Sequence, residues 1–132
     1  MNYLLDTHTF IWAISEQAKL SVKAKQAIDN SNNSIFVSSI TFWEIALKFS
    51  INKFGIEGTS PDVLPEIAVT MGFQLIQLSP EESASSHKLT LSPHKDPFDR
   101  ILIWQAIKRD YTFISKDARI NEHKNDGLKI LW

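Results

Sequence analysis

Four acidic residues lie at places in the chain where their side chains could bind a divalent metal ion together. They are Asp6, Glu44, Asp99 and Asp117. Two unit charges about 4 Å apart repel by about 4 kcal/mol at an effective dielectric near 20, so a carboxylate cluster needs protons or a cation. A set of ligands made only of oxygen atoms selects a hard ion. The chemistry that we expect from this cluster is therefore binding of Mg²⁺, or alternatively Mn²⁺.

Each acid also has a purely structural explanation. Asp6 and Asp117 could each cap the helix that follows them in the chain. Glu44 precedes Lys48 by four residues, which is the favoured order for a helical ion pair. Apolar residues flank Glu44 on both sides, however, and a glutamate in so apolar a helix needs a partner or a cleft. The residues alone leave both explanations open.

A further acid, Asp96, stands in the stretch HKDPFDRILIWQA at residues 94–106. Asp96 is a candidate N-cap, with Pro97 at the first helical position and Asp99 at the third. We therefore treat Asp96 as a secondary candidate for the site. Whether it is a metal ligand or only a helix cap stays open.

The elements that would position these acids alternate between short apolar strands and helices. Strands are predicted over residues 3–5, 35–37, 73–78 and 112–114, with another at the edge over 129–131. Helices are predicted over residues 21–29, 40–50, 61–71 and 98–108, and a further helix begins at Ser79. The helix over 40–50 is apolar on more than one face and is expected to be well buried.

This alternation implies crossover connections, and hence an α/β fold with a mostly parallel central sheet and helices on both faces. The length of 132 residues suits one domain, so residues 1–132 are predicted to form a single unit. Functional groups in such sheets gather beyond the carboxyl ends of the strands. Asp6 follows the first predicted strand and Asp117 follows the fourth, so both are expected at this edge.

Composition narrows the classes of function. The chain contains no cysteine, which excludes disulfides and thiolate metal sites and is typical of the reducing cytoplasm. No run approaches the roughly 18 apolar residues of a membrane span. The formal net charge of -1 does not by itself indicate a nucleic-acid partner.

Histidines and aromatic residues suggest two other kinds of site. The histidines are His8, His87, His94 and His123, but no HxxxH or HExxH pattern occurs, so we do not expect zinc. Trp43, Phe98 and Trp104 could stack on nucleobases. Their helical spacing favours packing in the core instead.

With these residues identified, the chain resembles PIN-domain proteins, and more narrowly the VapC-type toxins of type II toxin–antitoxin pairs. The matching stretches are LLDTHTFIWAI at 4–14, SSITFWEIALK at 38–48, HKDPFDRILIWQA at 94–106 and FISKDARI at 113–120. The resemblance implies a three-layer α/β/α fold and a Mg²⁺-dependent endoribonuclease. It places the family's catalytic and metal-binding acids at Asp6, Glu44, Asp99 and Asp117.

The resemblance also implies substrate contacts and partners. Thr7 and Ser115 fall where small hydroxyl residues line the family's site. Arg100, Lys116 and Arg119 flank the acids and are candidates for contacts to RNA phosphates, with ordinary surface charge as the alternative. An RNA substrate, with tRNA as the first expectation, a cognate antitoxin that covers the cleft, and a homodimer are implied as well.

Two other classes of function compete with a nuclease. One is a non-catalytic protein of the same fold that acts by binding its antitoxin or operator DNA. The other is a phosphoryl-transfer or receiver-like domain, which needs a second acid close to the nucleophilic aspartate. The first strand ends Asp6-Thr7-His8, without an adjacent acid, and this disfavours the receiver-like class.

Overall fold

Five strands form one parallel sheet in the computed structural model, which describes all of residues 1–132. The strands are β1 (Asn2–Leu5), β2 (Ser34–Ser38), β3 (Gln74–Ile76), β4 (Thr112–Ile114) and β5 (Lys129–Leu131). Their order is β3-β2-β1-β4-β5, and every neighbouring pair is parallel. The strand order reverses beside β1, so a crevice at the carboxyl ends of β1 and β4 is the expected place for a site.

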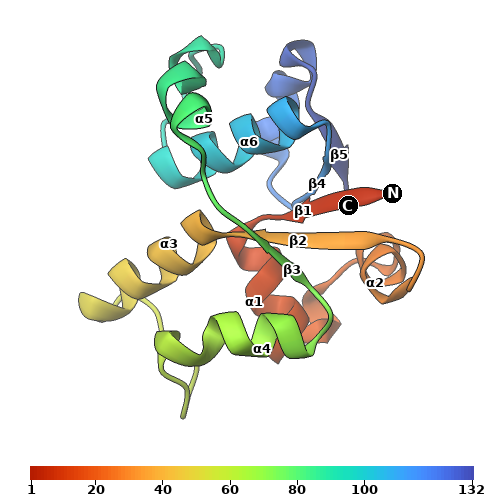
Figure 1. Cartoon of the computed structure of the whole chain (residues 1–132), viewed down its shortest axis with the longest axis vertical. Coiled ribbons are helices and arrows are strands. Elements are labelled where there is room, and N and C mark those ends of the chain that lie inside the picture. Colours follow the sequence, from red (N-terminus) through yellow and green to blue (C-terminus); the bar gives the residue numbers. More distant parts are fainter.

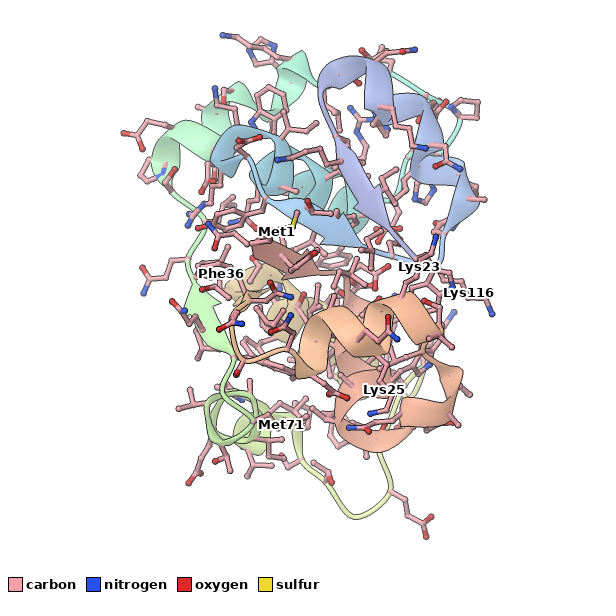
Figure 2. The ribbon with its side chains drawn as sticks, turned by 90° about the vertical axis from the view of Figure 1, so that its right-hand side faces the viewer. Met1, Lys23, Lys25, Phe36, Met71 and Lys116 are labelled. Atoms are coloured by element: carbon pink, nitrogen blue, oxygen red, sulfur yellow. The ribbon has the colours of Figure 1, made fainter.

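Helices cover both faces of this sheet. The α-helices are α1 (Thr7–Ser15), α2 (Val22–Asp29), α3 (Ser39–Ser50), α4 (Leu64–Thr70), α5 (Pro80–Ser85) and α6 (Pro97–Arg109). Short 3₁₀ helices are η1 (Gln17–Lys19), η2 (Pro61–Val63), η3 (Ser86–Lys88) and η4 (Ala118–Asp126). Helices α1, α2 and α4 lie on one side of the strands and α5 and α6 on the other (Figure 1). The view turned by 90° shows the same two helical layers (Figure 2). The predicted three-layer α/β/α fold is confirmed.

The central strands β1, β2 and β4 are buried on both faces, as a parallel sheet requires, whereas the edge strands β3 and β5 are partly exposed. Side chains alternate along β1, so that Tyr3 and Leu5 pack with Phe10 of α1, whereas Leu4 packs with Leu102 of α6 in a second cluster. The two apolar clusters hold the sheet between its helical layers. This packing holds β1 and β4 in place, so that the residues after their carboxyl ends lie at a defined edge of the sheet.

Helix α3 differs from its prediction. Ile40 and Ile45 are buried, but Trp43 is 60% exposed and Leu47 is exposed too. The expected core position is therefore wrong for Trp43, which instead meets the ring of Phe98 edge-on with centroids 5.1 Å apart. One face of α3 packs on the protein, whereas Trp43 and Leu47 leave much of the opposite apolar face exposed. The same expectation is confirmed for Trp104, which is buried.

Two other predicted elements change in extent. The strand expected over 73–78 is only β3, Gln74–Ile76, at an edge of the sheet. The helix expected over 61–71 divides into η2 and α4, and Gly72 follows it with a φ of 87°, in the left-handed conformation that closes many helices.

None of the helices combines the length and hydropathy that a membrane crossing requires.

Candidate active site

Asp6 stands where β1 turns into α1. Its backbone N–H donates to the carbonyl of Ile114 in β4 (3.2 Å), and its Oδ1 accepts from the N–H of Thr9 (2.7 Å), so Asp6 is the N-cap of α1. The residue is 9% exposed. Burial raises the pKa of its carboxyl, and hydrogen bonds with Ser115 and Thr9 oppose that rise. The capping explanation is confirmed, and the same bonds fix the carboxylate at the β1–β4 crevice.

Glu44 is the most deeply buried of the four acids, at 2% exposure on α3. The hydroxyl of Thr7 donates to its Oε1 (2.6 Å), and the ammonium of Lys48 contacts its Oε2. The predicted helical ion pair is therefore present. The Thr7 contact in addition ties Glu44 to the residue next to Asp6, so α3 delivers a carboxylate to the same edge of the sheet.

Asp96 and Asp99 occupy the first turn of α6. Asp96 is the N-cap, and its Oδ1 accepts from the N–H groups of Phe98 (2.9 Å) and Asp99 (3.1 Å). The cap predicted from the sequence is thus confirmed. The pKa of Asp99 is raised to about 6, first by burial and then by the negative charges of Asp96 and Glu44, against an opposing hydrogen bond from His94. Asp99 therefore lies within the field of two other acids.

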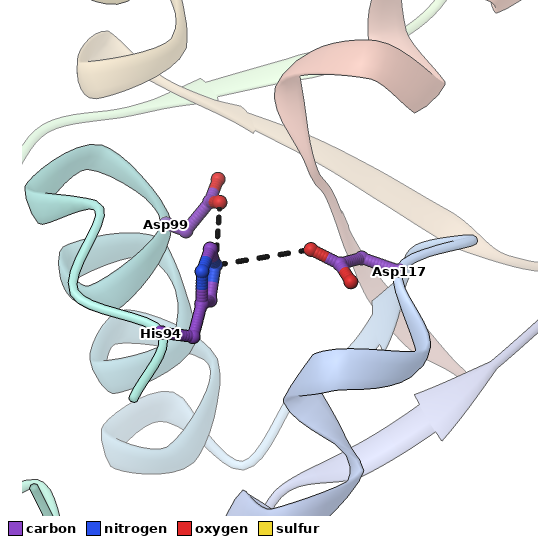
Figure 3. Close-up of side chains that lie close together, drawn as sticks. All are labelled: His94, Asp99 and Asp117. Atoms are coloured by element: carbon purple, nitrogen blue, oxygen red, sulfur yellow. Dashed lines mark hydrogen bonds and ion pairs between the residues drawn. The ribbon is translucent and has the colours of Figure 1, made fainter. Parts of the chain in front are cut away.

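His94 lies between two of these acids. Its Nε2 is 2.8 Å from Oδ2 of Asp99 and 3.8 Å from Oδ2 of Asp117 (Figure 3). One donor atom from each residue lies within 4.8 Å of the others, a spacing that a single cation could bridge. From the sequence, His94 was a candidate only for zinc and was not placed with the acids. The available signal was its position two residues before the Asp96 cap.

Asp117 follows β4 and caps η4. Its Oδ1 accepts from the N–H of Arg119 (2.9 Å), and the guanidinium of Arg119 bonds both carboxylate oxygens, with Nη2 2.8 Å from Oδ2. The Arg119 side chain holds the pKa of Asp117 below its usual value. The hydroxyl of Ser115 accepts from the N–H of Asp117 (3.1 Å). Ser115 thereby contacts both acids that flank the β1–β4 crevice.

Two surface hollows flank Arg119. One, of about 550 Å³, is lined by Pro93, His94, Lys95, Asp96, Arg119 and Glu122. The other, of about 290 Å³, is lined by Asp6, His8, Trp12, Lys116, Asp117 and Arg119. The ammonium of Lys116 lies 5.8 Å from the ring centroid of Trp12. Lys116 and Arg119 therefore line the hollow that contains Asp6 and Asp117, and their contact with phosphate stays a prediction.

Arg100 is placed differently from the other two basic candidates. Its guanidinium donates to the carbonyls of Thr90 (3.2 Å) and Leu89 (3.1 Å), and it lines a separate hollow with Lys95. These bonds fasten the loop before α6. Arg100 does not share either hollow that contains Arg119.

The donor set fits a divalent ion. Asp99 and Asp117 lie at ligand spacing with His94, Asp6 shares a hollow with Asp117, and Glu44 is outside this group but bonded to Thr7, the neighbour of Asp6. Burial raises the pKa of Asp6 and of Asp99, which means that both carboxylates lack compensating positive charge. A cation of charge two supplies that compensation.

Comparison with known sequences identifies the family. A sequence model described as the PIN domain matches residues 3–125, a range that contains all four acids. The chain belongs to the PIN-domain family. This PIN domain is 26% identical over 129 residues to Ribonuclease VapC22 of Mycobacterium tuberculosis (strain ATCC 25618 / H37Rv), and the match covers 98% of the chain and 97% of that protein.

Solved structures share the fold of this PIN domain at low sequence identity. VapBC2 from Rickettsia felis, bound to a DNA fragment from its promoter, has a TM-score of 0.71 at 17% identity, covering 99% of this chain and 98% of that one. VapBC-1 from nontypeable Haemophilus influenzae has a TM-score of 0.65 at 14% identity, covering 99% and 97%. A toxin–antitoxin complex from Klebsiella pneumoniae has a TM-score of 0.61 at 18% identity, covering 98% and 96%.

Proposed function

We propose that this PIN domain is a metal-dependent endoribonuclease and the toxin of a toxin–antitoxin pair. The observation that carries the proposal is the close group of Asp99, Asp117 and His94, beside the hollow that Asp117 shares with Asp6; Glu44 is tied to the residue next to Asp6 through Thr7. Similarity over nearly the full length of a protein named Ribonuclease VapC22 supports the choice of RNA as substrate. Mg²⁺ is the ion that we propose, with Mn²⁺ as an alternative.

Asp6 and Asp99 would bind the ion directly, and Asp117 would bind it directly or through a water molecule. Glu44 would be a further ligand or would orient a water molecule. A divalent ion bound there supplies a lowered pKa for a coordinated water and charge compensation for the phosphate oxygens in the transition state. The hydroxyl of Thr7 fixes Oε1 of Glu44, and Lys48 holds its other oxygen. The direction in which Glu44 presents its carboxylate is thus set before substrate arrives.

The basic residues at the site would position the RNA backbone. Lys116 and Arg119 line the hollow that also contains Asp6 and Asp117. Contacts from lysine and arginine to phosphates fix the register of a nucleic acid without reading its sequence. The choice of RNA, for which tRNA is our first candidate, therefore depends on features other than these two cations.

The proposed partners follow from the activity and from the structural relatives. The neighbours from Rickettsia felis, Haemophilus influenzae and Klebsiella pneumoniae include toxin–antitoxin assemblies. A nuclease that attacks cellular RNA in the cytoplasm needs a protein that blocks it, so we propose a cognate antitoxin over the acidic site, and a homodimer as the toxin's own assembly. Because the Rickettsia felis structure contains promoter DNA, a purely regulatory role is the second candidate.

The test is cleavage of end-labelled tRNA and of total RNA by the purified chain. We expect defined cuts with Mg²⁺ or Mn²⁺, none in excess EDTA, and none from Asp6→Asn or Asp99→Asn. Glu57→Gln removes an exposed carboxylate far from these acids in sequence and serves as the matched control with full activity. Cleavage that persists in EDTA, or wild-type rates from either aspartate variant, contradicts the mechanism. RNA left uncut under all conditions, together with specific operator binding by the antitoxin complex, favours the regulatory role.

A further inference from the structure

We propose that His94 is itself a ligand of the metal centre, through Nε2, and that the centre is a mixed nitrogen–oxygen site which binds Mn²⁺ more tightly than Mg²⁺. The inference rests on the proposed function only in placing a divalent ion at these acids. It adds a residue, a ligand type and an ion preference that the carboxylates alone do not give.

The distances around Nε2 match those between ligands of one ion. Ligand atoms that each lie about 2.1 Å from an octahedral ion are about 3.0 Å apart when adjacent and about 4.2 Å apart when opposite. Nε2 of His94 is 2.8 Å from Oδ2 of Asp99 and 3.8 Å from Oδ2 of Asp117. Donor atoms of all three residues fit within 4.8 Å. Because 4.8 Å exceeds the opposite-ligand spacing of about 4.2 Å, the side chains would close by up to about 0.6 Å around an ion.

The chain holds the imidazole in this place. His94 is 8% exposed, and its carbonyl accepts a hydrogen bond from the hydroxyl of Ser92 (3.0 Å), which is buried as well. Two residues later Asp96 caps α6 and fixes where the helix starts. The loop is therefore fastened on both sides of His94, and little side-chain freedom remains to be lost when an ion binds.

The partners of the two aspartates differ in a way that assigns His94 to Asp99. Asp117 is bonded by the guanidinium of Arg119 through two nitrogens. Asp99 has His94 as its side-chain hydrogen-bond partner. An ion that enters between Asp99 and Asp117 therefore takes the place of the proton that Nε2 now shares with Oδ2, and the imidazole binds it as the neutral tautomer that carries its proton on Nδ1.

The ligand type predicts the preference among ions. Mg²⁺ takes oxygen ligands and gives up water reluctantly, whereas first-row ions accept imidazole nitrogen. Replacement of one oxygen by Nε2 should thus favour Mn²⁺ over Mg²⁺. We expect the ratio of the two dissociation constants to exceed about tenfold in the wild type and to fall toward unity in His94→Gln, because loss of a group that supports a metal site weakens binding about 10- to 100-fold.

The experiment uses Mn²⁺ alone as the probe, with the full-length chain and no RNA. Electron spin-echo envelope modulation detects nitrogen bonded to Mn²⁺, and comparison of protein containing ¹⁴N-histidine with protein containing ¹⁵N-histidine tests the wild type without any substitution. We expect a directly bonded histidine nitrogen whose modulation changes with the isotope. It should vanish in His94→Gln and persist in His8→Gln, a control that removes the histidine of the neighbouring hollow.

The outcomes separate this inference from the proposed function. Mn²⁺ that binds stoichiometrically, requires Asp99 and shows no histidine nitrogen leaves the metal centre standing and overturns the role of His94. The role of His94 is also overturned if His94→Gln keeps the circular dichroism spectrum of the wild type and binds Mn²⁺ at least as tightly. In that case the imidazole only fills the space that the ion would take. Absence of any Mn²⁺ binding by the wild type overturns both.

Discussion

The substitution Asp99→Asn should make the metal-free protein more stable while it removes activity. The pKa of Asp99 is about 6 instead of 3.8, which corresponds to about 3 kcal/mol of destabilisation when this carboxylate is ionised at neutral pH. The side chain of Asp99 is 28% exposed, so solvent screens part of this electrostatic destabilisation. We expect Asn, which retains a hydrogen-bonding atom toward His94, to recover about 1 to 2 kcal/mol, a rise in melting temperature of about 3 to 8 °C.

The stabilisation expected from Asp99→Asn should depend on pH. A carboxyl whose pKa is raised in the folded state binds more protons there than in the unfolded chain, so the wild type loses stability as the pH rises from about 4 through 6. Below pH 4 the group is protonated in both states, and the penalty is absent. The melting temperatures of Asp99→Asn and the wild type in EDTA should therefore converge near pH 4 and separate toward pH 7.

Thermal unfolding followed by circular dichroism measures this directly, with Glu57→Gln as the control whose stability should stay within about 0.5 kcal/mol at every pH. Saturating Mn²⁺ should reverse the order, because an ion at 100 times its dissociation constant adds about 2.7 kcal/mol to the wild type and little to the variant. If Asp99→Asn is less stable than the wild type at pH 7 in EDTA, Asp99 is not a carboxylate short of positive charge, and the argument for a cation at this place fails.

Substitutions at three other residues test separate parts of the structure. Thr7→Val removes the hydroxyl bonded to Glu44 and should slow RNA cleavage at least tenfold with the fold intact, whereas Thr7→Ser should keep most of the activity. Asp96→Ala should lower the free energy of unfolding by about 1 kcal/mol in urea titrations, and Asp96→Asn should lower it by much less, because asparagine also caps helices. Glu82→Gln breaks the pair with Arg109 and should cost about 2 kcal/mol. Since the pKa of Glu82 is lowered to about 2, that contribution should disappear from the wild type as the pH falls from about 4.5 toward 2.

Much of the site was predictable because it is built from local signals. The capping role of Asp96 follows from its place before Pro97, and that of Asp6 from its place between an apolar strand and a helix. Parallel pairing of β1 and β4 then brings distant acids together, since the carboxyl ends of parallel strands share one edge. The alternation of strands and helices predicted a parallel sheet, but the neighbour relation of β1 and β4 comes from the structure.

The features that escaped prediction depend on tertiary packing. His94 lies in an irregular loop, where no periodicity shows which way a side chain points, and only the fastening of residues 92–96 directs it to Asp99. The core position of Trp43 was predicted from its helical spacing. Its exposure depends on which face of α3 meets the sheet, and helical periodicity cannot decide this when both faces are apolar.

The double role of the acids explains how the fold tolerates them before an ion binds. Asp6, Asp96 and Asp117 each accept backbone N–H groups at the start of a helix, where orphan donors and the local dipole favour negative charge. Glu44 has Lys48 instead, whereas Asp99 has only the imidazole of His94. The remaining electrostatic strain is thus concentrated on Asp99, the acid with the raised pKa of about 6. Stabilisation by a bound ion should for this reason be lost almost entirely in Asp99→Asn, and only partly in Asp117→Asn, where Arg119 already compensates the charge.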